Sequence, residues 1–391
     1  MKNRFVYKSL KRIADQAIRF ANRNLPALRA SQVTEMLPPV PAFTPALPQN
    51  VAQLPVELAA YFREEISLPA IRLFTLRQVS VSWHAVVFKG LRMFLPALAH
   101  PREIKHYDDT YLLQQWTGKP VHSPADGRPL VLVHNQWTST NYYHWMVDSL
   151  PRLLLLQSNY AHCRLLMPAP VPAYVRDSAA MLGFTELLLL QRGATLTGAD
   201  LLIPEHVAPP GYQHPALLRR IQQQLIEAVY LDTTPPRPFR KVYVSRRSQR
   251  VRRLVNEDDI RELLAQYGFE IREFEGLTVE QQVRLMTETK TFVTLHGAGL
   301  TNMLFLPAGA QVAELLNADK IVELTNQHFE NLIYFRMAAA LNLPYYCLPC
   351  SNASAGSPTN DADLCLDLEA LRQLLDLMAI QEPADPPLSP A

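Results

Sequence analysis

Apolar and polar positions alternate most regularly in the second half of the chain, from residue 239 onward. Short apolar runs typical of buried strands recur there, separated by segments in which apolar residues follow helical spacing. The runs occupy 241–246, 269–275, 291–295, 310–316 and 345–349. Such regular alternation predicts an α/β fold with a parallel sheet and helices on both of its faces.

Capping residues mark the helices of this half. Asn256 precedes a predicted helix over 257–268, which has acidic residues in its first turn and ends at Gly268. Thr278 opens the next predicted helix, over 279–289. These start and stop signals agree with the strand positions, which strengthens the prediction of alternating elements.

The first half of the chain has a less regular pattern. Strands are expected between 66 and 133, and a helix over 141–157 should kink at Pro151, which lacks a backbone donor. Residues 215–230 have the apolar spacing of an amphipathic helix. The proline-rich stretch 233–238 then predicts a linker, and we place the main domain boundary there.

The N-terminal segment combines basic charge with helical spacing. Residues 5–21 predict a basic amphipathic helix, which either lies on an anionic membrane surface or packs on its own domain. Charges interrupt it throughout, so it does not have the pattern of a secretory signal peptide. Prolines between 38 and 55 exclude regular helix or central strand there and indicate a linker or an extended segment.

Composition and charge narrow the class of protein. Of the 391 residues, 48% are hydrophobic and 19% charged, which excludes an intrinsically disordered chain. The net charge of +2 conceals two basic segments. Residues 1–30 hold eight Lys or Arg against one acid, and residues 237–253 hold eight and no acid. The remainder is acidic, so each basic segment predicts an anionic partner.

Cysteine usage favours a reducing compartment. The four cysteines are too few for a disulfide framework in a chain of this size, so the cytoplasm is expected. Cys347 and Cys350 form a C-x-x-C pair, but no second pair completes a zinc site. We expect both to be packed thiols. No run of about 18 apolar residues predicts a membrane-spanning helix.

Ligands bind open parallel sheets beyond the carboxyl ends of the strands, a rule that selects 245–247, 296–302 and Glu314. In the first of these stretches, Arg246 and Arg247 offer guanidinium groups that pair bidentately with phosphate oxygens. A small nucleotide-type anion is the favoured partner. The alternatives are a solvated basic loop and nucleic acid, and the acidic remainder of the chain disfavours nucleic acid.

The stretch HGAGLTN at 296–302 has the character of a ligand-binding turn. Gly297 and Gly299 allow the backbone to turn sharply and approach a ligand closely. The amides that follow can face an anion if they open a helix. The stretch is neither a Walker motif nor a complete dinucleotide fingerprint. His296 by itself is more typical of a structural histidine.

The aromatic stretch 141–152 holds a candidate acid–base pair. His144 and Asp148 are four residues apart, so on a helix they share one face and can couple by a hydrogen bond. Such a pair can tune a general base. An aromatic core helix whose His and Asp satisfy each other fits the same spacing.

Together these motifs resemble glycosyltransferase family 61, whose bacterial members are often described as capsular polysaccharide biosynthesis proteins. The resemblance covers about 130–320 and rests on NYYHWMVDSLPRLLLL at 141–156, VYVSRR at 242–247 and the stretch 274–315. It implies an inverting enzyme that uses a nucleotide-activated sugar. It also implies a GT-B-like fold, with two Rossmann-like domains facing a cleft.

The resemblance assigns donor-binding roles. Arg246 and Arg247 would neutralise the donor diphosphate, with Arg250 or Arg253 as helpers. Glu314 would bind the ribose hydroxyls. The remaining residues of the nucleotide and sugar pocket would be His296, Gly297, Ala298, Gly299, Thr301 and Asn302.

The resemblance also assigns the catalytic and acceptor sides. Asp148 would be the base that deprotonates the acceptor hydroxyl, and His144 its orienter or the alternative base. The acceptor or cleft lining would include Asn141, Tyr143, Trp145 and Arg152. No Asp-x-Asp motif lies at a strand end, so we expect no metal and no other cofactor. Arginine would then stabilise the leaving diphosphate.

These expectations define four segments of the chain. They are a basic helix and proline-rich linker over 1–65, an acceptor-side α/β domain over 66–234, a nucleotide-sugar-binding α/β domain over 235–350, and a tail over 351–391. The helix in the tail is expected to pack back on the N-terminal domain, by analogy with other GT-B type enzymes.

The predicted function is transfer of a sugar from a nucleotide-sugar donor to a hydroxyl of a glycan or lipid-linked glycan acceptor, in capsular or cell-surface polysaccharide synthesis. The alternative is a non-catalytic nucleotide-binding or scaffold protein of a polysaccharide assembly complex. The expected location is the cytoplasm, with residues 1–30 as the candidate contact to the inner membrane face. No nucleic-acid partner is expected.

Overall fold

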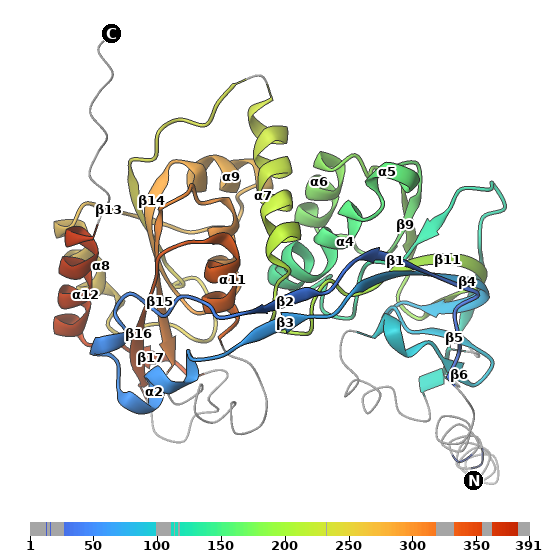
Figure 1. The fold of residues 1–391 in the computed structure, drawn as a ribbon, viewed down its shortest axis with the longest axis horizontal. Helices are drawn as coiled ribbons and strands as arrows, with labels where there is room; N and C mark the ends of the chain where they lie inside the picture. The colour runs from blue at the N-terminus through green and yellow to red at the C-terminus, as the bar shows by residue number, and fades with distance from the viewer. Residues whose placement is uncertain are drawn as a thin grey trace. The chain divides into compact units, whose positions relative to one another are not determined.

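The computed structural model describes residues 27–98, 118–231, 233–317, 332–353 and 362–381, with Ile13, Gln16, Tyr111, Leu112, Gln114 and Gln115 (Figure 1). The helix predicted over 5–21 lies outside the described residues except for Ile13 and Gln16, so it stays a prediction. Among the described residues, no helix is both long enough and apolar enough to cross a membrane.

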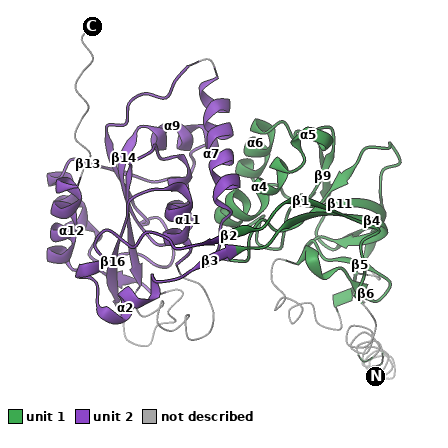
Figure 2. Ribbon diagram, in the orientation of Figure 1, with its two compact units in different colours: residues 1–41, 68–210 green, residues 42–67, 211–391 purple. Residues whose placement is uncertain are grey.

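The chain forms two compact units, each assembled from two separate stretches (Figure 2). Unit 1 contains residues 1–41 and 68–210, and unit 2 contains residues 42–67 and 211–391. The division differs from the predicted one in two places. The helix α7 (Pro215–Tyr230) contributes to unit 2, and so does the segment 42–67.

Unit 1 is built on a mixed sheet with nine strands among the described residues. Its main order is β10-β9-β8-β11-β4-β5-β6, and neighbours from β10 to β11 run parallel while those from β11 to β6 run antiparallel. β1 pairs with β4 and β7 with β11. The strands are β1 (Gln32–Leu37), β4 (Ile71–Ser82), β5 (Val87–Lys89), β6 (Arg92–Met93), β7 (Lys119–His122), β8 (Leu130–Val131), β9 (Arg164–Pro168), β10 (Leu187–Leu190) and β11 (Ala194–Pro204). Only the parallel part matches the Rossmann-like architecture expected for the first domain.

Short helices connect the strands of unit 1. Buried side chains of β4 and β11 form its core with those of neighbouring strands, among them Phe74, Leu76, Leu201 and Ile203. The helices are η2 (Leu95–Ala97), η4 (His144–Ser149), α4 (Leu150–Leu154), α5 (Gln157–Tyr160) and α6 (Ala173–Met181).

Unit 2 has the alternating architecture that its sequence predicts. Its sheet has the order β13-β12-β14-β15-β16-β17, and every neighbouring pair is parallel except β16 with β17. The strands are β12 (Arg240–Val244), β13 (Phe269–Arg272), β14 (Thr289–Leu295), β15 (Gln311–Asn317), β16 (Tyr345–Asn352) and β17 (Leu364–Cys365). All residues of β15 are buried, as expected for a central parallel strand covered on both faces.

Helices cover both faces of this sheet (Figure 1). α8 (Glu257–Gln266) and α12 (Leu368–Ile380) pack together on one face. α7, α9 (Val279–Thr287) and α11 (Ile333–Leu341) form the other layer with η5 (Ala298–Phe305). Thr278 opens α9 as predicted, and the structure adds a capping box in which Thr278 and Gln281 bond each other's backbone.

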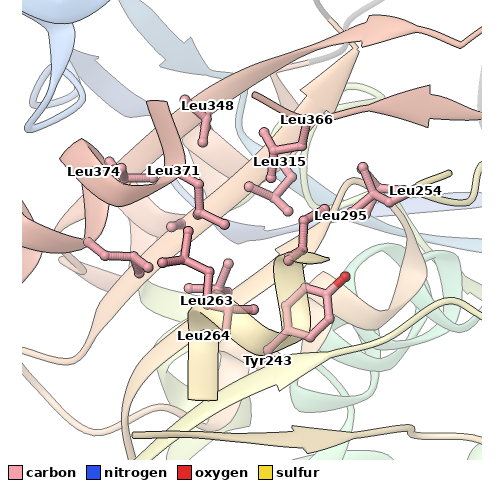
Figure 3. Close-up of a cluster of buried hydrophobic side chains, with 14 of the residues drawn as sticks. Tyr243, Leu254, Leu263, Leu264, Leu295, Leu315, Leu348, Leu366, Leu371 and Leu374 are labelled. Carbon is pink, nitrogen blue, oxygen red and sulfur yellow. The ribbon is translucent and has the colours of Figure 1, made fainter. Parts of the chain in front are cut away.

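The core under α8 and α12 shows how the last helix is anchored. Leu371 and Leu374 of α12 pack with Leu263 of α8 and with Leu315 and Leu348 of the sheet (Figure 3). The contacts that anchor this helix are thus within unit 2, and its predicted packing on the N-terminal domain stays a prediction. Its apolar stripe is buried within unit 2, and Asp367 caps its first turn.

The proline-rich segment before residue 68 is extended and is part of two sheets. β1 pairs with β4, and β2 (Val40–Phe43) pairs with β3 (Ile66–Leu68). Between β2 and β3 lie η1 (Val51–Gln53) and α2 (Val56–Tyr61). The buried side chain of Asn50 accepts from the amide of Cys347 at 3.1 Å and donates to its carbonyl at 2.7 Å. The Asn50 side chain thus bonds to the backbone of β16 as a neighbouring strand would, and this attaches the segment 42–67 to unit 2.

Candidate functional site

The carboxyl ends of three parallel strands bring the candidate donor-binding residues of unit 2 to one edge. Val244, Thr294 and Glu314 stand in register on β12, β14 and β15. Ser245 and His296 follow directly beyond the ends of the first two strands. The sheet thus assembles the stretches that the strand-end rule selected.

Arg246 lies against the glycine turn that follows β14. A Cβ atom added at Gly297 would overlap its Nη1 and lie 3.2 Å from its Cζ. Gly297 has φ 152° and ψ −179°, a conformation essentially restricted to glycine. The absence of a side chain at Gly297 therefore makes room for the guanidinium at the start of η5.

Arg247 has different surroundings from its neighbour. Its side chain is 59% exposed and pairs with Asp258 of α8 at 2.7 Å. Its amide donates to Ser245 Oγ at 3.1 Å, which closes the turn. Arg246 and Arg247 were predicted to neutralise the donor diphosphate together. In this structure only Arg246 lies against the glycine turn, and Arg247 is exposed and paired with an acid.

The residues after Gly297 form a 3₁₀ helix, η5. The amides of this stretch therefore open a helix, which was the condition for them to face an anion. Ala298 and Gly299 are partly exposed, whereas Thr301 and Asn302 are buried. Asn302 Nδ2 donates to the carbonyl of Gly299 at 3.3 Å, and Thr301 Oγ1 lies 3.5 Å from the Tyr334 hydroxyl. Thr301 and Asn302 were predicted to line the pocket. Instead they fix the turn and its packing.

Glu314 is a partner of His296 rather than a surface carboxylate. Its side chain is only 2% exposed, and its two oxygens bond to His296 Nδ1 and to the Tyr345 hydroxyl. The predicted contact with ribose hydroxyls stays a prediction, and in this structure both oxygens are buried and bonded to other side chains. A carboxylate only accepts hydrogen bonds, so Nδ1 of His296 is the donor in this pair and Nε2 is the ring nitrogen left for another partner.

A second arginine, Arg252, belongs to the same surroundings as Arg246. The charges of both act on the buried hydroxyl of Tyr334, whose ring packs edge-on against His296 at 5.2 Å between centroids. Burial, and then the neighbouring charge of Arg252, lower the pKa of Arg246. Arg252 belongs to the basic stretch 237–253, but a run of arginines does not reveal which of them turns inward, and no local pattern points to Tyr334.

The candidate base lies in unit 1, on an unusual helix. The segment His144–Ser149 is a π-helix, and Leu150 bonds back to the carbonyl of Trp145. The kink predicted at Pro151 thus takes the form of a widened turn, and Pro151 sits in the first turn of α4, where its missing amide costs little. Such π turns frequently occur at functional sites.

The predicted pair is formed on this helix. His144 Nδ1 lies 2.6 Å from Asp148 Oδ2, and the side chains are 25% and 19% exposed. Trp137 stacks on the His144 ring at 4.9 Å, and Tyr143 packs edge-on against it. The predicted hydrogen bond is confirmed. The other carboxylate oxygen, Asp148 Oδ1, takes no part in this bond. Trp137 lies outside the motif at 141–152, so the motif did not reveal it as a neighbour of His144.

Several neighbours of this pair are structural. Arg152 is 1% exposed and donates to the backbone carbonyls of Val133 and Pro204. Burial lowers its pKa to about 9. Trp145 is fully buried and donates to Ser178 Oγ at 2.7 Å. The prediction that Arg152 and Trp145 line a cleft is therefore wrong, because both side chains are buried in unit 1 and form their hydrogen bonds there.

Tyr143 and Asn141 support the same helix. Tyr143 is 4% exposed, so its role is to pack against His144 rather than to line a surface. Asn141 Oδ1 accepts from the amide of Tyr143 at 3.0 Å, which satisfies a free donor near the start of the helix. Of the four residues predicted for the acceptor side, only Asn141 is partly exposed.

The part of the chain that the structure describes contains no group of three or more His, Cys, Asp or Glu side chains placed to hold a metal ion. The expectation of a metal-independent reaction stays a prediction. Cys347 and Cys350 are buried in β16, and burial raises the pKa of Cys350 to about 12. Both are the packed thiols that the sequence analysis expected.

Comparison with known proteins supports a glycosyltransferase. Residues 142–313 match the family described as Glycosyltransferase 61. The chain is also similar to the EGF domain-specific O-linked N-acetylglucosamine transferase of Mus musculus, with 31% identity over 115 residues. The corresponding protein of Drosophila melanogaster is 30% identical over 113 residues.

These similarities are regional. Each alignment covers 28% of this chain and 22% of the relative, so the matched region spans about a fifth of the length of these curated relatives. Both are animal proteins, whereas the resemblance in the sequence analysis named bacterial capsular polysaccharide proteins. The matched family region includes both the His144–Asp148 pair and the Arg246–Gly297 turn.

Proposed function

We propose, from the family match over 142–313 and the geometry of the two sites, that this protein is an inverting glycosyltransferase. It transfers a sugar from a nucleotide-sugar donor to a hydroxyl group of a glycan acceptor. The observation that carries the proposal is the Arg246 guanidinium lying over the glycine turn at the carboxyl end of a parallel sheet. That place in an open α/β sheet is where phosphorylated ligands bind.

The donor binds unit 2 in this proposal. Arg246 neutralises charge on the diphosphate as the bond to the anomeric carbon breaks, which is the step at which negative charge grows on the leaving group. The missing side chain at Gly297 leaves room for the Arg246 guanidinium beside the turn, and the partly exposed residues Ala298 and Gly299 bring their backbone to the ligand. His296, fixed by Glu314, presents Nε2 as a hydrogen-bonding group.

The acceptor is activated by unit 1. Asp148 removes the proton from the attacking hydroxyl while that oxygen attacks the anomeric carbon on the face opposite the diphosphate, which inverts the configuration. His144 holds Asp148 Oδ2 at 2.6 Å, so Oδ1 is the oxygen that receives the proton. The proposal requires a GT-B-like arrangement, in which the two sites meet across the donor during turnover.

Titration calorimetry with UDP, GDP, CMP and dTDP, in the presence of EDTA, tests donor binding. At least one nucleotide should bind, and the corresponding sugar nucleotides then enter a transfer assay. Asp148→Asn should lower kcat by about 10²- to 10⁴-fold while nucleotide affinity stays unchanged, because the base acts only on the acceptor. Asp177→Asn on α6, in the same unit, is the matched control and should retain activity.

Two outcomes would remove this function. If no nucleotide binds, the chain is not a nucleotide-sugar enzyme. If nucleotides bind but no sugar donor is turned over in the presence of glycan acceptors, the non-catalytic nucleotide-binding or scaffold role is favoured instead. Retained activity of Asp148→Asn would transfer the role of base to His144.

The finer assignments are part of the same proposal. The acceptor is a capsular or cell-surface glycan, free or linked to a lipid, and the enzyme works in the cytoplasm at the inner membrane face. Eight basic residues against one acid in 1–30 support attraction to anionic lipid. Co-sedimentation with phosphatidylglycerol vesicles should fall when residues 1–26 are deleted. Equal partitioning of both proteins would exclude this contact.

A further inference from the structure

Arg252 is unusual among the arginines of β12 and of the stretch that follows it. Arg240, Arg247 and Arg253 each pair with an acidic side chain in the described structure. Arg252 has no such pair with the described residues, and its buried Nε has no hydrogen-bond partner. The buried Nε of Arg246 is in the same state.

The two unpaired arginines are neighbours. Arg252 takes a left-handed conformation, with φ 56°, which is uncommon for a residue with a side chain. The charge of each acts on the Tyr334 hydroxyl, and burial and then Arg252 lower the pKa of Arg246. Among the described residues neither arginine forms an ion pair, and Glu275 acts on Arg246 only as a more distant charge. Two like charges held close together destabilise the empty protein, and a bound anion would remove that cost.

We propose that Arg252 is the second guanidinium of the diphosphate site, acting with Arg246 where Arg247 was expected. Two guanidinium groups offer enough donors to bind two adjacent phosphate groups, and arginine binds phosphate oxygens with a planar fork. The site lies at the start of η5, where Gly297 leaves room for the Arg246 head group. The identity of the anion as the donor diphosphate rests on the proposed function.

Inorganic pyrophosphate tests this site without any assumption about the nucleotide. In calorimetry on the full chain, pyrophosphate should bind more tightly than orthophosphate, because it carries more negative charge and offers one phosphate group to each guanidinium. Arg252→Ala and Arg246→Ala should each weaken pyrophosphate binding by at least about tenfold, since charge-assisted hydrogen bonds are lost. Arg252→Lys keeps the charge but not the fork, and should weaken binding severalfold.

Arg261→Ala is the matched control for loss of one positive charge. Arg261 lies on α8, is 39% exposed and approaches Asp258 only at 4.0 Å, so affinity should change less than twofold. Thermal unfolding without ligand should show Arg252→Ala at least as stable as the wild type, because a repulsive charge is removed. A rise in unfolding temperature with pyrophosphate should be present in the wild type and lost in Arg252→Ala.

The outcomes separate this inference from the proposed function. If Arg252→Ala and Arg252→Lys bind pyrophosphate like the wild type, or if the wild type does not bind it, Arg252 is not part of an anion site. If nucleotide sugars are turned over normally by the Arg252 variants, the function stands and this inference fails. If pyrophosphate binding depends on Arg252 but no nucleotide binds, the anion site stands and the glycosyltransferase proposal fails.

Discussion

At the scale of single residues, adjacent positions in one motif have opposite surroundings. Arg246 is turned inward over Gly297, while Arg247 is exposed and paired with Asp258. The sequence showed that arginines follow a strand end, and this placement is correct. It could not show which arginine turns inward, because that depends on the turn geometry and on a glycine that lies 51 positions further along the chain.

Glu314 shows a related limit of sequence reasoning. Its place at the end of β15 was predicted, but its partners were not. Tyr345 belongs to the next strand in the sheet, and its hydroxyl occupies Oε2 at 2.5 Å. Whether a carboxylate at a strand end faces solvent or a buried hydroxyl depends on which strand becomes its neighbour, and no local pattern around Glu314 contains that information.

The variant Glu314→Gln tests the role of this carboxylate in fixing His296. The amide cannot accept from both His296 and Tyr345 as the carboxylate does, so the tautomer of the imidazole is no longer fixed. We expect kcat of the transfer reaction to fall by about 10- to 100-fold, the range found for partners that orient a functional histidine. Steady-state kinetics with the donor identified in the nucleotide screen measures this.

Tyr345→Phe is the matched control, because it removes the other hydrogen bond of Glu314 and leaves the one to His296. It should lower the free energy of unfolding by about 1–3 kcal/mol, since a buried acceptor loses its partner. Its kcat should stay close to that of the wild type. Equal kinetic loss in both variants would show that Glu314 acts only through the packing of the core.

At the scale of elements, the strands and helices of unit 2 follow from sequence more closely than those of unit 1. Strong periodicity and capping residues located α8, α9 and the parallel strands. In unit 1, Pro151 signalled an irregular helix but not its form. A missing donor is compatible with a kink, a break or a π turn, and packing of Trp145 and Arg152 into the interior accompanies the π turn found here.

Substitution of Gly297, at the junction of β14 with η5, tests the geometry of this turn. Gly297→Ala places a Cβ in a backbone conformation that only glycine adopts readily, and the Cβ would overlap the Arg246 head group. The free energy of unfolding should fall by about 1–3 kcal/mol, measured by urea denaturation. Pyrophosphate affinity should fall as well, because Arg246 must move.

Gly299→Ala is the comparison variant two residues further along. A Cβ there would meet Phe274 at 3.5 Å, an ordinary contact, and the backbone does not require glycine. Its free energy of unfolding should change by no more than about 0.5 kcal/mol. If both variants lose the same stability, the special conformation at Gly297 is not what limits this turn.

At the scale of the whole molecule, the assignment of segments to units was the least predictable feature. The proline-rich composition of 233–238 predicted a domain boundary there. The boundary instead follows residue 210, and the segment 42–67 belongs to unit 2 although the residues on either side of it belong to unit 1. Contacts between positions almost 300 residues apart, such as Asn50 with Cys347, decide this division. Local composition signals where a chain is extended and not which core it joins.

Two phenylalanines only twelve positions apart test that division. Phe62 packs edge-on against Phe335 at 5.0 Å in unit 2, and Phe74 packs against Phe94 at 5.2 Å in unit 1. Truncation of a buried phenylalanine to alanine costs about 3–5 kcal/mol. Phe62→Ala should therefore accelerate hydrogen exchange in α11 and β16 and leave β9 and β11 unchanged, whereas Phe74→Ala should do the reverse. Faster exchange in β11 of Phe62→Ala, with β16 still protected, would show that 42–67 stabilises unit 1 and that the division of the chain is different.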